Sequence, residues 1–156
     1  HTLSCSHCGY EAVADRYGFF HCDGAKNPMR YVSDWSRWIL EQERRKQAAG
    51  LQMPVSCGTA IHMIDFEKNA FREVGRGKLT VSTDGLCLEG TIGDEPVTIR
   101  IPADNVPTLP FSPGKYLELQ RGKDIYRCRL DDGKLVMKYI NLVKLNYQRC
   151  HEAICT

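Results

Sequence analysis

Two cysteines near the N-terminus, Cys5 and Cys8, form a C-x-x-C-G turn in the segment CSHCG. Two thiolates at this spacing can point at one metal ion, and the glycine allows the tight turn whose amide groups donate hydrogen bonds to the sulfurs. A structural zinc ion takes four ligands, usually from two such turns, and the sequence contains no second C-x-x-C. Cys22 is a candidate third ligand. The sequence therefore indicates half of a tetrahedral zinc site.

Three interpretations of these cysteines stay open. Cys22, together with His7 or His21, could complete a zinc site within this chain. Alternatively, the matching turn lies upstream of the first residue, which would leave Cys5 and Cys8 without metal or joined in a disulfide; the absence of an initial Met favours such an upstream segment. In the third interpretation, the turn is a redox motif. A redox C-x-x-C usually stands at the start of a helix beside a βαβ pattern, and the sequence shows no such pattern.

Motifs typical of enzymes are missing from the sequence. It contains no G-x-S-x-G, no Walker A loop, no H-E-x-x-H and no G-x-G-x-x-G. None of the histidines stands at a motif spacing from a nucleophile or a carboxylate. His62 and Asp65 fall in a predicted strand, where residues three positions apart point to opposite faces, so they are not expected to form a dyad. No catalytic residue is predicted.

A local group of cations offers a binding surface instead. It lies around the connection between the first two strands of the sheet predicted below and comprises Lys68, Arg72, Arg76 and Lys78. Cations clustered at the open end of a barrel can hold phosphorylated lipid headgroups or another anionic partner. Because Glu67 and Glu73 are interleaved with these cations, a solvated loop of mixed charge is the simpler alternative.

Composition bounds the class of protein. A chain of 156 residues, of which 42% are hydrophobic, fits one domain or two small ones. The 21 Lys and Arg against 19 Asp and Glu give a net charge of +2, which does not favour a nucleic-acid partner. No run of about 18 apolar residues predicts a membrane span. The 8 cysteines form no dense framework, which favours a reducing, cytoplasmic compartment.

Three segments of the chain differ in composition and hydrophobic periodicity. Residues 1–32 are rich in turn formers and have little periodicity, which is typical of a small metal-stapled unit. Residues 33–50 form a predicted linker helix, with Ser33 or Asp34 as its N-cap and Gly50 at its end. Residues 59–156 form the third segment, in which alternating apolar runs replace the helical pattern.

The third segment predicts a small antiparallel β structure. Its alternating runs indicate about seven short strands, at spacings typical of a sandwich or barrel. Thr83-Asp84-Gly85 lies between two of these runs and predicts a β-hairpin. The prolines of NVPTLPF indicate an edge or bulged strand. Residues 134–153 have a helical apolar stripe. The predicted fold class is α+β, with a pleckstrin-homology-like (PH-like) barrel capped by an amphipathic C-terminal helix.

Five stretches carry a resemblance to a known family. The segments CSHCG, DRYGFFH and NPMRYVSDWSRW resemble the zinc ribbon and linker helix that follow the acyltransferase domain in some bacterial lysophospholipid acyltransferases of the 1-acyl-glycerol-3-phosphate acyltransferase family. GKLTVSTDGLCLEG and IPADNVPTLPFSPGKYLEL resemble the PH-like or GRAM-like barrel at the C-terminus of the same proteins. The resemblance implies that Cys5 and Cys8 are two of four zinc ligands, with the other pair upstream.

One departure from the family bears on activity. Its catalytic signature is a histidine followed, after four residues, by an aspartate, and no histidine here has an aspartate at that position. The resemblance therefore implies a non-catalytic C-terminal accessory domain of a phospholipid-synthesis acyltransferase. It would aid association with an anionic membrane lipid, or regulation, at the inner face of the membrane, with the upstream acyltransferase domain as its partner. The alternative is an adaptor module that binds a protein or nucleic-acid partner through its ribbon and barrel.

Overall fold

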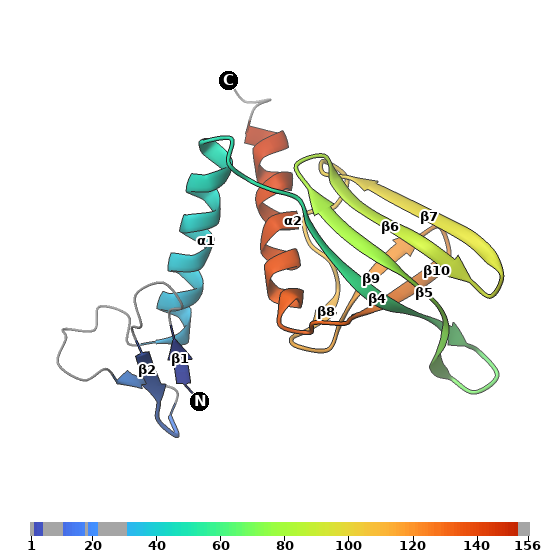
Figure 1. Ribbon diagram of the computed structural model, residues 1–156, viewed down its shortest axis with the longest axis horizontal. Helices are drawn as coiled ribbons and strands as arrows, with labels where there is room; N and C mark the ends of the chain where they lie inside the picture. The colour runs from blue at the N-terminus through green and yellow to red at the C-terminus, as the bar shows by residue number, and fades with distance from the viewer. Residues whose placement is uncertain (1, 5–10, 18, 22–30, 153–156) are drawn as a thin grey trace. The chain divides into compact units, whose positions relative to one another are not determined.

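The computed structural model describes residues 2–4, 11–17, 19–21 and 31–152 (Figure 1). The chain divides into two compact units, His1–Gly50 and Leu51–Thr156, and each unit is described here by itself.

A three-stranded sheet and one helix make up the described part of the N-terminal unit. Strands β1 (Thr2–Ser4), β2 (Glu11–Ala14) and β3 (Phe20–His21) pair antiparallel in this order. Asp15 organises the β2–β3 turn, because its Oδ1 accepts hydrogen bonds from the backbone N–H groups of Tyr17 and Phe19 at 2.8 and 3.0 Å. Its Oδ2 lies 2.9 Å from His21 Nε2, and this hydrogen bond lowers the pKa of Asp15.

Helix α1 (Val32–Ala48) confirms the helix predicted over residues 33–50, although it ends two residues earlier, and its role as a linker stays a prediction. The predicted N-cap is wrong, because the helix begins one residue before Ser33. Asp34 stands in the first turn and reaches back from there, so that its Oδ2 accepts a hydrogen bond from the backbone N–H of Tyr31 at 3.1 Å. A carboxylate at this position satisfies an amide that the helix itself leaves without a partner.

The C-terminal unit is a single antiparallel sheet followed by one helix. Its strands are β4 (Val55–Asp65), β5 (Ala70–Ser82), β6 (Gly85–Ile92), β7 (Glu95–Pro102), β8 (Phe111–Ser112), β9 (Tyr116–Arg121) and β10 (Asp124–Leu130). Helix α2 (Leu135–Glu152) follows them. The order of the strands across the sheet is β7-β6-β5-β4-β10-β9-β8. Seven antiparallel strands ending in one helix are the element order predicted for a PH-like fold.

The prediction of a closed barrel is wrong. In the described part of the chain β7 and β8 stand at opposite ends of the strand order and do not pair with each other, so the sheet remains open between them. Closure would need a ladder of backbone hydrogen bonds between its two ends. Strand β8 is only two residues long, and β7 contains prolines, so neither edge can supply such a ladder.

The Asp-Gly hairpin is confirmed. Strands β5 and β6 pair in register up to Ser82 and Gly85, which leaves Thr83 and Asp84 as the two-residue turn. Gly85 has φ +135, a conformation that side chains rarely adopt.

The segment NVPTLPF contains no full strand. Only Phe111 of this segment belongs to a strand, the short β8, and residues 103–110 form a loop. Pro107 and Pro110 lack the backbone N–H that a ladder needs. The prediction of an edge or bulged strand therefore holds only for Phe111, which lies in the edge strand β8, and is wrong for the rest of the segment.

The sheet curls where glycines of β5 and β6 meet. Gly77 and Gly90 are register partners. A Cβ on Gly77 would lie 2.5 Å from the carbonyl oxygen of Glu89 and 3.1 Å from the Cα of Gly90. Backbones can come this close only where side chains are absent. A β-bulge opposite Ile61 and His62 adds to the bend of β5.

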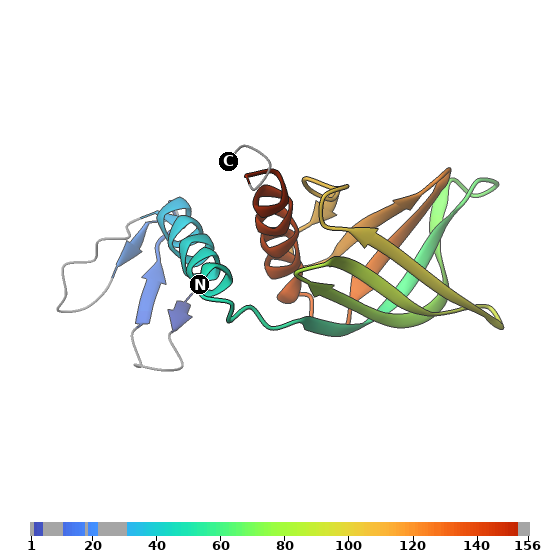
Figure 2. The same cartoon turned by 90° about the horizontal axis from the view of Figure 1, so that it is seen from above.

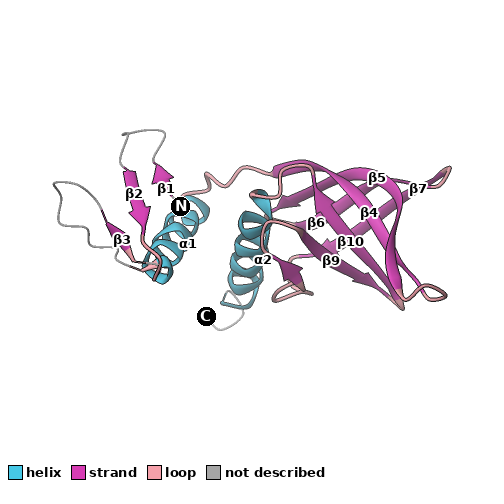
Figure 3. Ribbon diagram, turned by 90° about the horizontal axis from the view of Figure 1, so that it is seen from below, coloured by secondary structure: helices cyan, strands magenta, loops and turns pink. Residues whose placement is uncertain are grey.

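Helix α2 covers one end of the curled sheet (Figure 3). The Tyr139 hydroxyl, fully buried, lies 3.1 Å from the carbonyl oxygen of Val55 and 2.8 Å from that of Leu79. Asn146, which is 1% exposed, donates from Nδ2 to the carbonyl oxygen of Ser82 at 2.7 Å. These bonds fix the helix against β4 and β5. Its buried residues are Val136, Tyr139, Ile140, Leu142, Val143, Leu145 and Asn146.

Candidate functional site

The predicted zinc ligands Cys5, Cys8 and Cys22 lie outside the described residues. Within the described ranges, no group of three or more His, Cys, Asp and Glu side chains could hold a metal ion. The zinc site therefore stays a prediction. The described cysteines Cys57, Cys87, Cys128 and Cys150 are free thiols.

The predicted absence of a His62–Asp65 dyad agrees with the register of β4. Both residues belong to this strand and are three positions apart, so their side chains point to opposite faces. His62 instead lies 3.9 Å from Glu73 of β5, and its Nδ1 is buried without a hydrogen-bond partner in the described part of the chain.

The four predicted cations do not share one surface. On β4, Met63 is the register partner of Arg72, and Ala60 is the register partner of Arg76. Because Met63 and Ala60 are three residues apart on one strand, Arg72 and Arg76 point to opposite faces of the sheet. Lys78 follows Arg76 on the same face as that residue.

Carboxylates accompany the two cations on that face. The Arg76 Nη2 lies 2.6 Å from Asp131 Oδ1. Lys78 stands directly across from Glu89 of β6 in the register. Opposite charges in such cross-strand positions attract each other. The positive charge of Arg76 and Lys78 is therefore balanced locally by two carboxylates.

Among the described residues of the sheet unit, the most exposed large apolar side chain stands at the tip of the β4–β5 hairpin. Residues 66–69 form a tight connection, in which Asp65 Oδ1 accepts hydrogen bonds from the backbone N–H groups of Glu67 and Lys68 at 3.1 and 3.3 Å. Phe66 is 83% exposed. The tip stands at the end of the sheet far from α2 (Figure 2). An exposed aromatic ring on a well-formed turn is suited to contact an apolar phase.

A second feature, on the outer face of the sheet, was missed by sequence reasoning. The Arg127 guanidinium of β10 lies over the rings of Phe71 and Tyr116, at 3.5 and 4.0 Å from their centroids. Its Nε and Nη2 donate to Glu118 Oε1 at 2.9 and 2.7 Å. The cation is thus held by two rings and a carboxylate from β5 and β9. Arg127 therefore links β10 to β5 and β9 and stabilises the sheet, and neither Arg127 nor Glu118 is left available to react with a substrate.

The open side of the sheet forms a groove, which we call the seam groove. It runs between edge strand β7 and strand β9, with the loop 103–110 as its wall. One end has a volume of about 550 Å³ and is lined by Thr98, Ile99, Arg100, Asn105, Gln120 and Arg121. The other end has a volume of about 290 Å³ and is lined by Pro107, Leu109, Pro110, Leu119 and Ile125, among others. Ile101, Val106 and Gln120 line both ends, so the two are continuous.

Charge is divided unevenly along the seam groove. Arg100 and Arg121 are the ionisable residues that line the larger end. Neither forms an ion pair within the described ranges. Glu118 lines the smaller end, and its Oε1 already accepts both hydrogen bonds from Arg127. The groove is therefore cationic at one end and apolar at the other.

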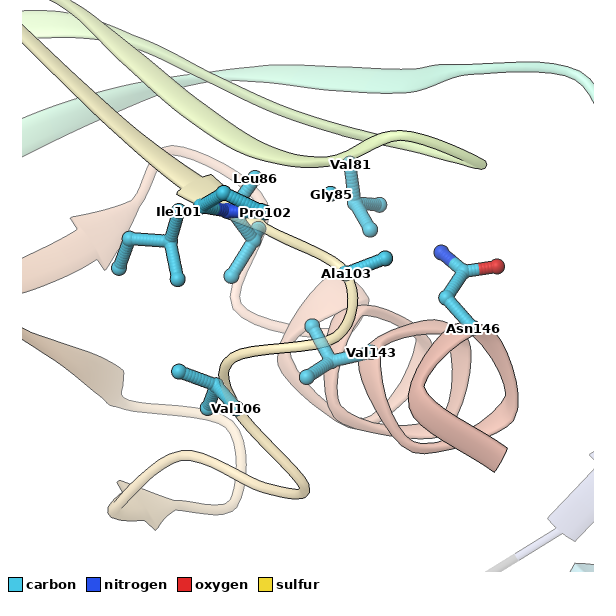
Figure 4. Close-up of a pocket in the computed structure, with 9 residues that line it drawn as sticks. All are labelled: Val81, Gly85, Leu86, Ile101, Pro102, Ala103, Val106, Val143 and Asn146. Atoms are coloured by element: carbon cyan, nitrogen blue, oxygen red, sulfur yellow. The ribbon is translucent and has the colours of Figure 1, made fainter. Parts of the chain in front are cut away.

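A much smaller cavity lies where α2 meets β6 and β7 (Figure 4). Its volume is about 10 Å³, which is no more than one water molecule occupies. Aliphatic side chains such as Val81, Leu86 and Val143 surround it, and Asn146 stands at its edge. It is a packing gap in the core and has no room for a ligand.

Two buried titratable groups belong to the core as well. Burial raises the pKa of the Cys128 thiol to about 12, which keeps it protonated at neutral pH. Burial also raises the pKa of Tyr139, whose hydroxyl lies within hydrogen-bond distance of two carbonyl oxygens. Both groups are neutral in the folded protein, and neither is placed to act as a nucleophile or base.

Comparisons with known proteins give one likeness in structure. No protein-family model matches the chain, and no curated protein matches it. The solution structure of the Dm DCP1 EVH1 domain in complex with the XRN1 DBM peptide is similar in fold at 12% sequence identity, with a TM-score of 0.43. The likeness covers 80% of this chain and 96% of that one.

Proposed function

We propose that this chain is a non-catalytic accessory region of a phospholipid-synthesis acyltransferase and contacts the membrane through the tip of its β4–β5 hairpin. The family part of the proposal rests on the sequence resemblance given above. The membrane contact is supported by the exposure of Phe66, whose side chain is 83% exposed at that tip. None of the described helices is long and apolar enough to cross a membrane.

The chemistry of the tip favours a shallow apolar contact. Asp65, Glu67 and Glu73 outnumber Lys68 and Arg72 in this part of the hairpin, so attraction to anionic lipid is weak. Full burial of one phenylalanine side chain contributes about 1.5–3 kcal/mol. Such a contact alone binds a bilayer weakly and reversibly, so the bound fraction is measured at high lipid concentration, and the contact can orient a region that an upstream domain keeps near the membrane.

Flotation of the 156-residue protein with vesicles of phosphatidylcholine, with and without phosphatidylglycerol, tests the membrane contact. We expect Phe66→Ser to lower the bound fraction about tenfold on both vesicles. Met53→Ser is the matched control, because Met53 is 76% exposed in the same unit but lies away from the hairpin. Equal binding of Phe66→Ser and the unsubstituted protein would contradict the proposal.

The parent gene tests the family part separately. The proposal requires a second C-x-x-C upstream of His1 and an H-x-x-x-x-D further upstream. A reading frame that begins near His1 would contradict it, whatever the vesicles show.

The adaptor function is a second candidate, and the seam groove is the observation that favours it. A groove with an apolar floor and two arginines can hold a protein segment as well as a small molecule. The net charge of +2 still disfavours nucleic acid as the partner.

A further inference from the structure

The seam groove offers backbone as well as side-chain groups to a ligand. Arg121 donates from Nη1 to the carbonyl oxygen of Thr98 at 3.3 Å, which shows that this carbonyl points away from β6 and into the groove. In an antiparallel strand the N–H and C=O of one residue point to the same side, and the side alternates along the strand. The N–H groups of Thr98 and Arg100 therefore also face the groove.

Two prolines bound this stretch of free edge. Pro96 and Pro102 occupy the same alternate positions of β7 as Thr98 and Arg100, so they face the groove without an N–H. A long strand cannot pair along β7, which protects the edge from pairing with another sheet. A short extended segment can still pair with the two residues between the prolines.

The side chains of the groove suit alternate residues of such a segment. An extended peptide turns every second side chain to the same face. Arg100 and Ile101 are neighbours on β7, so their side chains point to opposite faces of the strand. One set of alternate peptide side chains would therefore meet Ile101 and Val106, with Leu109 at the apolar end, and the other set would meet Arg100. Arg100 and Arg121 stand at the opposite end, which makes it complementary to a carboxylate.

From this combination we propose that the seam groove binds a short extended peptide segment that carries an acidic side chain. The acidic side chain lies between Arg100 and Arg121, and the aliphatic side chains lie on the apolar floor. The peptide backbone pairs with β7 between Pro96 and Pro102. This site is separate from the hairpin tip and does not depend on a membrane role of the protein.

A phage-displayed library of random dodecapeptides, selected on the intact 156-residue protein, tests the proposal. We expect enrichment of peptides with Asp or Glu close to aliphatic residues. The double substitution Arg100→Gln/Arg121→Gln should weaken a selected peptide about tenfold or more, and added salt should weaken it too. Arg129→Gln is the matched control, because Arg129 is an exposed arginine of β10 that does not line the groove. This control should leave the affinity unchanged.

Val106→Asp provides a second variant that does not touch the arginines. It places a carboxylate on the floor and should also abolish binding of an acidic peptide. Thermal unfolding of each variant shows whether it is folded. The proposal is overturned if no peptide is enriched, if enriched peptides lack acidic residues, or if they bind a folded Arg100→Gln/Arg121→Gln protein equally well. Anionic vesicles whose binding requires Arg100 and Arg121, in the absence of enriched peptides, would likewise overturn it in favour of a lipid site.

Discussion

The guanidinium of Arg121 lies 3.3 Å from the carbonyl oxygen of Thr98, so a side chain of β9 reaches the free edge of β7. In a closed barrel a backbone ladder would instead join β7 to β8, the strand at the other end of the sheet. Among the described residues, the Arg121 side chain makes the hydrogen bond that crosses the opening, and the N–H groups of Thr98 and Arg100 remain available. The groove lies at this opening because β7 and β8 do not pair with each other.

Hydrogen exchange can verify the free edge directly. We expect the amides of Thr98 and Arg100 to exchange quickly, because they face the groove, and the amide of Ile99 to exchange slowly, because it faces β6. Exchange measured by NMR resolves these neighbouring amides. Equal protection at all three positions would show that β7 has a partner on its outer side.

The hydroxyl of Tyr139 is expected to stabilise the fold by linking α2 to β4 and β5. Tyr139→Phe leaves two carbonyl oxygens without this donor and should lower the free energy of unfolding by about 1–3 kcal/mol. Urea unfolding at pH 7 measures this loss.

The same tyrosine predicts a pH dependence. Burial raises the pKa of Tyr139 in the folded protein above its ordinary value of 10.0. The contribution of Tyr139 to the free energy of unfolding is therefore fully present below pH 10.0. As the pH rises above 10.0, this tyrosine ionises in the unfolded chain but stays protonated in the folded protein, which stabilises the unfolded chain relative to the folded one. Stability should therefore fall less steeply above pH 10 in Tyr139→Phe than in the unsubstituted protein, and identical slopes would count against the assignment.

Cys128 should resist alkylation in the folded protein. Its pKa of about 12 leaves about one thiol in ten thousand ionised at pH 8, and its side chain is fully buried. Cys57 and Cys87, which are partly exposed, serve as internal controls. Mass spectrometry after iodoacetamide treatment should find the controls modified and Cys128 protected until urea unfolds the chain. Modification of Cys128 at the rate of Cys57 would contradict its place in the core.

The close approach of β5 and β6 predicts that Gly77 cannot be replaced. Gly77→Val should destabilise the fold by about 2–4 kcal/mol, because its Cβ would press on the backbone of Glu89 and Gly90. Gly122→Ala is the control, since Gly122 has φ +63 but nothing within 4 Å of an added Cβ, and it should cost about 1 kcal/mol. Thermal unfolding compares the two, and a loss at Gly77 no larger than the loss at Gly122 would contradict the crowding between β5 and β6.

Local patterns in the sequence predict the elements of this protein well. The alternation around Thr83-Asp84-Gly85 is enough to locate a hairpin. The position of Gly50 predicts the end of α1 to within two residues. Both features depend on neighbours in the sequence. NVPTLPF shows the opposite case, because whether its apolar residues form a strand depends on finding a partner edge, and its prolines prevent that.

The candidate sites depend on contacts that the sequence does not display. Arg76 pairs with Asp131, which is 55 positions away in the sequence. The spacing of the cations along β5 therefore could not show that a carboxylate neutralises Arg76. Arg100 and Arg121 lie on different strands and come together only because the sheet curls. The exposure of Phe66 follows from how far β4 and β5 extend, which their apolar pattern does not reveal.

A fluorophore placed at the hairpin tip shows whether the tip enters a lipid surface. Phe66→Trp adds an indole at the tip, and the unsubstituted protein, with Trp35 and Trp38 alone, provides the background. Vesicles containing brominated lipid quench tryptophans that reach the acyl chains. We expect the indole at position 66 to be quenched when vesicles are added, and the background fluorescence to stay unchanged. An unquenched indole on protein that has floated with the vesicles would contradict this expectation.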